Sequence, residues 1–368
     1  MISKRRRVLL AGLGLVALWG ATQAGRHYRI AHPDRNHTMT DLLKDNQAFC
    51  VGRFLIDLPS GSVIIGASGS GAGAQFDVEY PVTRQEFERR MADRWADLEK
   101  RTADIYGTRY AEPSKRLQPL PNAFLFNYEH VLLSGPDVYG IARDRVHHET
   151  EGYLWRESNL YSFRDHQVDS LVLDSMRALQ VRDERQMPAG QGFCGPRSFF
   201  AGGTKPEAIS IMFRLPGKPE MAFHLDTTTW ANVDGLEGPV LSTPPRPNVA
   251  MYESENFKGM THRDAPRRIE GFDGHEWIDG ATERSPRGSK TSIRASWFYK
   301  GEPSSSSKPA IHARLEISYE TAELPSPWGG FPAKNEAVRI GNEEFMTYWD
   351  TILGTLRLRP GALMPGEK

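Results

Sequence analysis

Two segments of the chain carry the same pattern of apolar positions. From Val168, apolar or small residues recur at i, i+3, i+4, i+7, i+8 and i+11, a stripe that predicts an amphipathic helix with one buried face. A second stripe with the same spacing begins 177 positions later, at Phe345. The two stripes are Val168, Leu171, Val172, Ser175, Met176 and Leu179, and Phe345, Tyr348, Trp349, Ile352, Leu353 and Leu356. Each predicted helix passes into a short alternating tail that ends on an arginine, Arg182 or Arg359.

A repeated strand pattern opens each of these segments. Residues 49–53 (FCVGR) lead into an apolar strand that we expect to run to Pro59, and residues 193–197 (FCGPR) lead into another through Phe200. The two cysteines lie 144 positions apart and the two helices 177, so the second copy holds about 33 more residues, which we assign to loops. Because both ends match in the same order, the sequence predicts two copies of one module.

Alternating apolar positions predict mostly strands between these ends. Strands are expected at residues 63–65, 76–80, 124–128, 138–142, 153–155, 160–163, 209–213, 221–225, 292–299 and 312–319, and residues 268–277 are expected to form two strands joined by a tight turn. A helix is expected after Thr83, which with Glu86 has the spacing of a capping box. We expect loops at the glycine-rich residues 66–73, the proline-rich residues 241–248 and the serine-rich residues 301–309.

The predicted fold class is α+β, with each module an antiparallel sheet and packed helices. The expected boundaries are a tether with a short lead-in helix at 25–46, an N-terminal domain at 47–186, a C-terminal domain at 187–359 and a tail at 360–368. The long loops of the second module and the glycine-rich loop of the first would suit a two-jaw clamp around a partner. The alternative is that these loops are tolerated surface insertions.

The first 24 residues have the pattern of a targeting segment. A basic cluster precedes fourteen apolar residues, and residues 22–24 (TQA) form a cleavage site. The apolar run is shorter than the roughly 20 residues of a membrane-spanning helix. We therefore expect a cleaved signal peptide at residues 1–24, with an uncleaved N-terminal anchor to the inner membrane as the alternative, and an exported body in either case.

Composition and charge narrow the class of protein. A length of 368 residues with 39% hydrophobic residues and 34 glycines is typical of two globular domains with many turns. The formal charge is zero, and without the four basic residues of the leader the count is 42 basic against 46 acidic side chains. This balance gives no support for nucleic-acid binding, which needs a basic face.

The expected export of the protein bears on the redox state of its only two cysteines, Cys50 and Cys194. In an oxidising compartment a lone pair of cysteines usually forms a disulfide. That bond would join the two modules and close a loop of about 143 residues. The alternative is two buried free thiols, each packing as a small hydrophobic side chain.

The motifs that suggest chemistry are incomplete, so we predict no catalytic, cofactor-binding or metal site. Residues 66–70 (GASGS) lack the second glycine of the Gly-x-Ser-x-Gly nucleophile turn. Residues 275–279 (HEWID) have Asp279 where a zinc-protease helix has its second histidine, and flanking glycines favour a strand. His147 and His148 are adjacent on an expected strand, where their side chains would point to opposite faces.

Three segments resemble a known family. Residues 50–59 (CVGRFLIDLP), 192–194 (GFC) and 271–277 (GFDGHEW) are similar to the tandem-domain immunity proteins that neutralise phospholipase effectors of bacterial type VI secretion. The resemblance covers nearly the whole chain after the leader. It implies a periplasmic protein whose two α+β immunity domains grip a cognate lipase like a claw, without a cofactor. We expect a monomer that binds one effector, and the resemblance assigns no contact residue.

Two other functions stay open from the sequence. The first is an exported hydrolase with an unrecognised site, which a buried acid–base pair beside a deep cleft would favour. The second is a periplasmic adaptor that binds another protein. The adaptor differs from the immunity protein only in its partner.

Overall fold

The structure is a computed structural model. It describes residues 45–71, 74–104, 107, 109–136, 142–166, 168–202, 207–218, 220–229, 257–285, 288–302, 305–321 and 342–363. The predicted leader at 1–24, the tether up to residue 44 and the predicted loop at 241–248 lie outside these residues. In the described part of the chain, no helix is long and apolar enough to cross a membrane.

The described elements are mainly strands, with three helices. The strands are β1 Asn46–Val51, β2 Phe54–Pro59, β3 Val63–Gly71, β4 Ala74–Glu79, β5 Lys115–Leu117, β6 Ala123–Pro136, β7 Ala142–Arg156, β8 Asn159–His166, β9 Leu179–Val181, β10 Gly192–Gly195, β11 Ser198–Ala201, β12 Ala208–Arg214, β13 Met221–Thr228, β14 Phe257–Ile269, β15 Phe272–Ser285, β16 Gly288–Tyr299, β17 Ala310–Thr321 and β18 Arg357–Leu358. The helices are α3 Arg84–Glu99, α4 Asp169–Ala178 and α5 Asn342–Leu353. This content confirms the α+β class.

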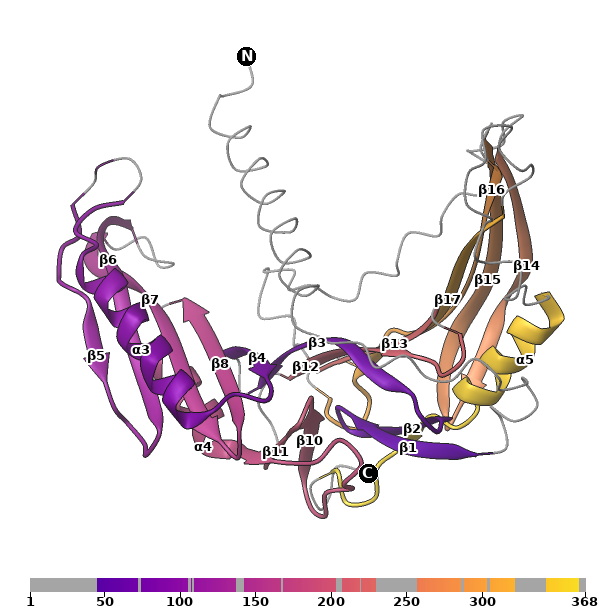
Figure 1. Ribbon diagram of the computed structural model, residues 1–368, viewed down its shortest axis with the longest axis horizontal. Helices are drawn as coiled ribbons and strands as arrows, with labels where there is room; N and C mark the ends of the chain where they lie inside the picture. The colour runs from indigo at the N-terminus through magenta and orange to yellow at the C-terminus, as the bar shows by residue number, and fades with distance from the viewer. Residues whose placement is uncertain are drawn as a thin grey trace.

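One antiparallel sheet of twelve strands runs through the molecule in the order β14-β15-β16-β17-β13-β12-β3-β4-β8-β7-β6-β5. The strands of both predicted modules meet where β3 pairs with β12. In Figure 1, β5 to β8 rise at one end and β14 to β17 at the other, with β3, β12 and β13 between them. The domain boundary predicted at 186/187 stays a prediction, and strands from its two sides form one continuous sheet.

The convex side of this sheet is apolar and covered. Hairpin β1–β2 lies below the central strands in Figure 1, and α5 lies outside β14 to β17. Phe49 packs edge-on against Phe213 of β12 with ring centroids 5.0 Å apart, and Phe54 packs against Phe272 of β15 at 5.7 Å. These rings belong to the largest cluster of buried apolar residues in the described chain. Because strand side chains alternate between faces, the opposite, concave side carries the polar positions.

The two copies exchange their opening hairpins. Hairpin β1–β2, at the start of the first copy, pairs with β18, which follows the closing helix α5 of the second copy. Hairpin β10–β11, at the start of the second copy, pairs with β9, which follows α4 of the first. Each hairpin therefore completes a small sheet with the end of the other copy.

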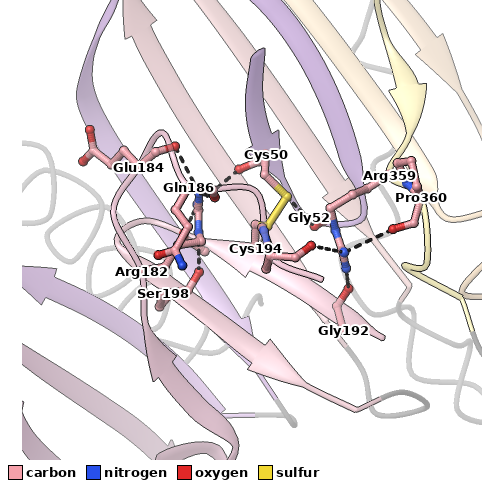
Figure 2. Close-up of a disulfide and its surroundings, with 12 residues drawn as sticks. Cys50, Gly52, Arg182, Glu184, Gln186, Gly192, Cys194, Ser198, Arg359 and Pro360 are labelled. Carbon is pink, nitrogen blue, oxygen red and sulfur yellow. Dashed lines mark hydrogen bonds between the residues drawn. A yellow bond between two sulfur atoms is a disulfide. The ribbon is translucent and has the colours of Figure 1, made fainter. Parts of the chain in front are cut away.

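The Cys50–Cys194 disulfide joins the two exchanged hairpins (Figure 2). The expected disulfide is present, and its sulfur atoms are buried with Leu55 and Phe199. Beside the disulfide, the backbone N–H of Gly52 donates to the carbonyl of Cys194 at 2.9 Å, and the N–H of Cys194 donates to the carbonyl of Gly52 at 2.7 Å. The disulfide and these two hydrogen bonds therefore hold the two hairpins together at one point, which we call the crossing.

Two arginines at equivalent positions hold the chain around this crossing (Figure 2). Arg182 donates to the carbonyls of Cys50 and Gly195, and Arg359 donates to those of Gly192 and Pro188. Burial lowers the pKa of Arg182 to about 10. These are the arginines that end the two repeated tails in the sequence, so the repeat marks a shared structural role.

A buried ion pair ties the first hairpin to the main sheet. Arg53 is 1% exposed and its Nε donates to Glu207 Oε1 at 2.7 Å, just before β12. Its Nη2 donates to Glu207 Oε2 at 3.2 Å. Two buried charges of opposite sign tolerate burial only together, because each one alone would lack compensation.

The helical predictions are largely confirmed. The stripes bury Val172, Ser175 and Met176 of α4 and Phe345, Tyr348, Trp349, Ile352 and Leu353 of α5. Val168 is an exception, since it precedes α4 and is 40% exposed. Thr83 caps α3, where its Oγ1 accepts from the Glu86 N–H at 3.2 Å.

Two strand predictions and one loop prediction were wrong. The expected single strand to Pro59 is a hairpin that turns at residues 52–53, and residues 193–200 turn in the same way at residues 196–197. The expected glycine-rich loop continues strand β3 up to residue 71. A Cβ at Gly69 would lie 2.7 Å from Ile209 and 2.8 Å from Phe76, so glycine lets these side chains pack on the backbone. Of the strand expected at 138–142, only residue 142 is described, as the start of β7.

We expect the disulfide to supply much of the resistance to unfolding. Replacing both Cys50 and Cys194 by alanine removes a link across 144 residues, which is worth about 4 to 5 kcal/mol in the chain-entropy model. Urea unfolding of the double variant should show a loss of this order, and reduction of the wild type should reproduce it. Equal midpoints with and without reductant would show that the crossing holds without the bond.

The Arg53–Glu207 pair gives a second stability test. Arg53→Met leaves the Glu207 carboxylate buried without its main cation, which should cost about 3 to 5 kcal/mol in the free energy of unfolding. The double variant Arg53→Met, Glu207→Leu removes both charges and should recover most of that loss. Additive losses in the double variant would show that the two side chains act independently.

Candidate functional site

The concave side of the twelve-stranded sheet carries rows of mostly polar side chains in cross-strand register, with Met212, Ala222, Trp277 and Phe298 among them. The first row is Ser68, Ser210, Asp226, His312, Phe298 and His275. The second is Met212, His224, Arg314, Ser296 and Trp277. The third is Arg214, Ala222, Glu316, Arg294 and Asp279. We call these three rows the concave face.

A histidine–aspartate cluster lies at the centre of the concave face. His224 Nε2 lies 3.1 Å from Asp226 Oδ1, and His312 Nδ1 lies 3.5 Å from Asp226 Oδ2. Burial alone would raise the pKa of Asp226, but hydrogen bonds from His224 and His312 outweigh it and hold that pKa well below its usual range. Asp226 is therefore an ionised hydrogen-bond acceptor that fixes both imidazoles.

The cluster contains a serine, a histidine and an aspartate, but not in the geometry of a proton relay. Ser210 Oγ lies 2.8 Å from His224 Nε2, the same nitrogen that faces Asp226. A nucleophile triad needs the acid and the serine on opposite ring nitrogens. Here the other nitrogen, Nδ1, faces the Arg314 guanidinium, which donates to it. Nε2 then carries the proton and cannot take one from Ser210.

The outer part of the concave face is a ladder of charges. Arg294 Nε lies 3.4 Å from Glu316 Oε2, and both side chains are partly exposed. Asp279 pairs with Arg294 in register and accepts from Thr261 at 2.9 Å. Buried polar atoms of His312 (Nε2), Arg314 (Nε) and Asp279 (Oδ2) have no hydrogen-bond partner within the described chain. Because these atoms are buried, a partner cannot reach them; the partly exposed groups, such as Arg294 and Glu316, are the ones that a polar partner can contact.

Helix α5 is held to its arm by a charge network around the buried Glu276. Glu276 of β15 accepts from Trp349 Nε1 at 2.6 Å and from Arg263 at 2.9 Å. Arg263 and Arg267 also donate to Asp350 of α5, at 2.8 and 2.6 Å. Burial would raise the pKa of Asp350, but these arginines hold it below its usual range. The second arm is therefore held as one body.

Helix α3 is locked to the other arm in a similar way. Arg94 donates to both carboxylate oxygens of the buried Glu151 on β7, at 2.7 and 3.0 Å. Tyr128 and Tyr153 donate to the same carboxylate at 2.6 and 2.8 Å. Burial would raise the pKa of Glu151, and the hydrogen bonds from Arg94 and the tyrosines lower it overall. Register carries the polar side of the sheet to Glu151, so α3 lies on that side.

The motifs singled out in the sequence have structural roles. Residues 275–279 lie on β15, where Glu276 belongs to the α5 network and His275 pairs with Asp264 at 2.6 Å. His148 on β7 lies 2.9 Å from Asp169 at the start of α4. In the described residues, no three histidine, cysteine or acidic side chains are placed to hold a metal ion.

Sequence reasoning missed the central cluster. Its signal was present, because His224 and Asp226 are two apart on a strand and so share a face. The partners Ser210 and His312 come from β12 and β17, and only the strand order brings them alongside.

The low pKa of Asp226 predicts a stability difference that depends on pH. Because that pKa is lower in the folded protein than in the unfolded chain, the carboxylate stabilises the fold above pH about 4 and loses this effect as pH falls further. Asp226→Asn should cost about 1 to 3 kcal/mol at pH 7 and much less near pH ~2.

Urea unfolding across this pH range measures the effect. Asp273→Asn is a matched control, because the Asp273 side chain is 77% exposed and its loss should matter little at any pH. A wild-type advantage over Asp226→Asn that stayed constant down to pH ~2 would contradict the assignment.

A family model matches the second half of the chain, and solved structures are similar in fold to most of its length. Residues 186–361 match the family model described as the Tle cognate immunity protein 4 C-terminal domain. No curated protein matches the sequence. Among solved structures, the fold is similar to a chain of the Tle4–Tli4 complex, with a TM-score of 0.62 and 17% identity over 89% of this chain and 100% of that one.

The apo structure of the immunity protein TplEi of the type VI secretion system from Pseudomonas aeruginosa is also similar. Its TM-score is 0.57, with 19% identity over 86% of this chain and 98% of that one. TplEi complexed with a peptide called "L" aligns over the same shares, with a TM-score of 0.55 and 18% identity. The family expected from the sequence is confirmed over residues 186–361, which match the C-terminal domain of Tle cognate immunity protein 4, an immunity protein family.

Proposed function

We propose that this protein is a periplasmic immunity protein that binds a type VI secretion phospholipase effector and blocks its activity, protecting the cell that makes both. The observation that carries the proposal is the family match over residues 186–361. The fold supports it, since immunity proteins align with 86 to 89% of the chain. The printed descriptions of two neighbours, a Tle4–Tli4 complex and a peptide complex of TplEi, are in keeping with a protein partner.

The concave face is the proposed binding surface. It lies between two arms that rise on the same side of the central strands in Figure 1, an arrangement that suits two jaws closing on one effector. The buried networks of Glu151 and Glu276 make each arm rigid, so little conformational entropy is lost on binding. The partly exposed charges of Arg294 and Glu316 can give specificity, because only a partner with complementary charges pairs with them.

Inhibition by occupation needs no catalytic group on this chain. The serine, histidine and aspartate of the concave face do not form a relay, which disfavours the hydrolase alternative. A single effector gripped between two arms implies one-to-one binding by a monomer. No cofactor is required for that role.

The proposed place of action is the periplasm. A disulfide between Cys50 and Cys194 persists in an oxidising compartment, and the bacterial periplasm is one. The basic and apolar leader at 1–24 accounts for export, as a cleaved signal peptide or as an anchor to the inner membrane.

Titration of phospholipase activity tests the function. The enzyme encoded next to this protein, assayed on phospholipid vesicles, should lose nearly all activity when equimolar protein is added. Glu316→Arg, on the concave face, should weaken that inhibition by about 10-fold or more, because it places a like charge beside Arg294 and reverses the charge that this position presents to the partner.

The matched control is Glu343→Arg, the same charge change on α5, outside the concave face. It should inhibit like the wild type. Full phospholipase activity at equimolar wild-type protein would overturn the proposed function. Equal weakening by both variants would remove the concave face as the binding surface while leaving the function intact.

A further inference from the structure

A two-stranded ribbon extends from the first arm. Residues 131–136 of β6 pair with residues 142–147 of β7. Their outer edges are open in the described structure, because β5 pairs with β6 only at 125–127 and β8 pairs with β7 only from residue 149 onward. A two-stranded ribbon with free edges is marginal alone in water. A partner that supplies hydrogen bonds to those edges would stabilise it.

The ribbon carries an unusual share of exposed apolar side chains on both of its sides. Leu132 is 53% exposed and Val146, directly opposite it, is 40% exposed. Leu133, which points to the other side by strand alternation, is 41% exposed. These are three of the nine large apolar residues found exposed in the described chain. Clustered exposed apolar side chains mark a contact surface rather than ordinary surface scatter.

One side of the ribbon combines apolar and anionic groups. Asp144 is exposed and pairs with Ser134, two positions along from the Leu132–Val146 pair and on the same side. A carboxylate therefore lies about 7 Å along the strand from two aliphatic side chains. Leu132, Val146 and Asp144 therefore share one side of the ribbon. An aliphatic pair beside an anion is the chemistry of an acyl chain beside a phosphate.

The geometry favours a groove in a protein over a membrane surface. A segment that lies on a bilayer needs one apolar side and one polar side, whereas this ribbon has apolar side chains on both. Its open strand edges would also leave backbone N–H and C=O groups unsatisfied in hydrocarbon, at several kcal/mol each. A groove in a protein provides apolar walls and hydrogen-bond partners together.

We propose that the ribbon enters the acyl-binding groove of the phospholipase and takes the place of its lipid substrate. This inference rests on the proposed function. A phospholipase groove must hold an acyl chain next to an anionic head group, so it offers apolar walls and positive charge. Leu132 and Val146 fill the apolar part and Asp144 meets the charge. The ribbon thereby makes the inhibitor competitive with lipid.

A competition experiment tests the placement. Binding of the wild-type protein to the phospholipase is measured with dodecylphosphocholine below its micelle concentration and, separately, with phosphocholine, which has the same head group and no chain. The long-chain compound should raise the apparent Kd in proportion to its concentration, and phosphocholine, which can fill only the head-group part of the groove, should raise it far less. An apparent Kd that neither compound changes would overturn the proposal.

Leu132→Asp and a control substitution test whether Leu132 of the ribbon contacts the phospholipase. Leu132→Asp should weaken binding by about 30-fold or more if the side chain is a central contact, and should leave the Tm unchanged because the residue is exposed. Leu117→Asp is the same change at a 47% exposed leucine on β5, outside the ribbon, and should bind like the wild type. Equal binding by Leu132→Asp and the wild type would also overturn the proposal.

Vesicle sedimentation tests the alternative that the ribbon binds a membrane surface and not a groove of the phospholipase. Wild-type protein should stay in solution with vesicles of phosphatidylethanolamine and phosphatidylglycerol. Sedimentation of the wild type but not of Leu132→Asp would make the ribbon a lipid contact and overturn the proposal. A wild type that fails to bind the phospholipase at all would instead contradict the proposed function, so the two failures are distinct.

Discussion

Two β-hairpins exchange partners at the centre of this molecule, and the Cys50–Cys194 disulfide joins them there. Hairpin β1–β2 covers the convex side of strands that belong to the second half of the chain, through contacts such as Phe49 with Phe213. Without this exchange, the apolar side of the central strands would lose part of its cover. The geometry between the two arms therefore depends on a crossing fixed by one covalent bond and the reciprocal hydrogen bonds of Gly52 and Cys194.

The two sides of the long sheet have different tasks. The convex side buries its apolar residues under β1–β2, α4 and α5 and supplies the stability. In the first arm the concave side also buries apolar residues, under α3, but in the central strands and the second arm it carries charges and hydrogen-bonding groups such as Asp226 and Arg294. The division explains how a fold stabilised by burial can also present a polar surface of defined geometry to a partner.

The sequence predicted local structure well because periodicity is a local property. The buried faces of α4 and α5, the Thr83 cap and most strands follow from spacing alone. The glycines of β3 predicted a loop, but at Gly69 the missing side chain lets Ile209 and Phe76 pack closely on the strand backbone. The turn at Gly195-Pro196 was a signal that a Cys-bearing segment folds back on itself.

The exchange of hairpins and the concave cluster could not be predicted in the same way. Strand order decides that Ser210, His224 and His312 lie side by side, and strand order depends on contacts between segments far apart in the chain. The repeated arginines Arg182 and Arg359 were visible in the sequence as the ends of two tails. Their role, as donors to carbonyls of the two hairpins, appears only once the hairpins are placed.

The central claim is that an effector binds on the concave side between two arms held by the hairpin crossing. Hydrogen–deuterium exchange of the chain, with and without the phospholipase, tests it most directly. The account predicts new protection in β12, β13, β16 and β17 and in the β6–β7 ribbon, with little change in β1, β2 and α5. Protection confined to β1, β2 and α5 would place the partner on the convex side and contradict the account.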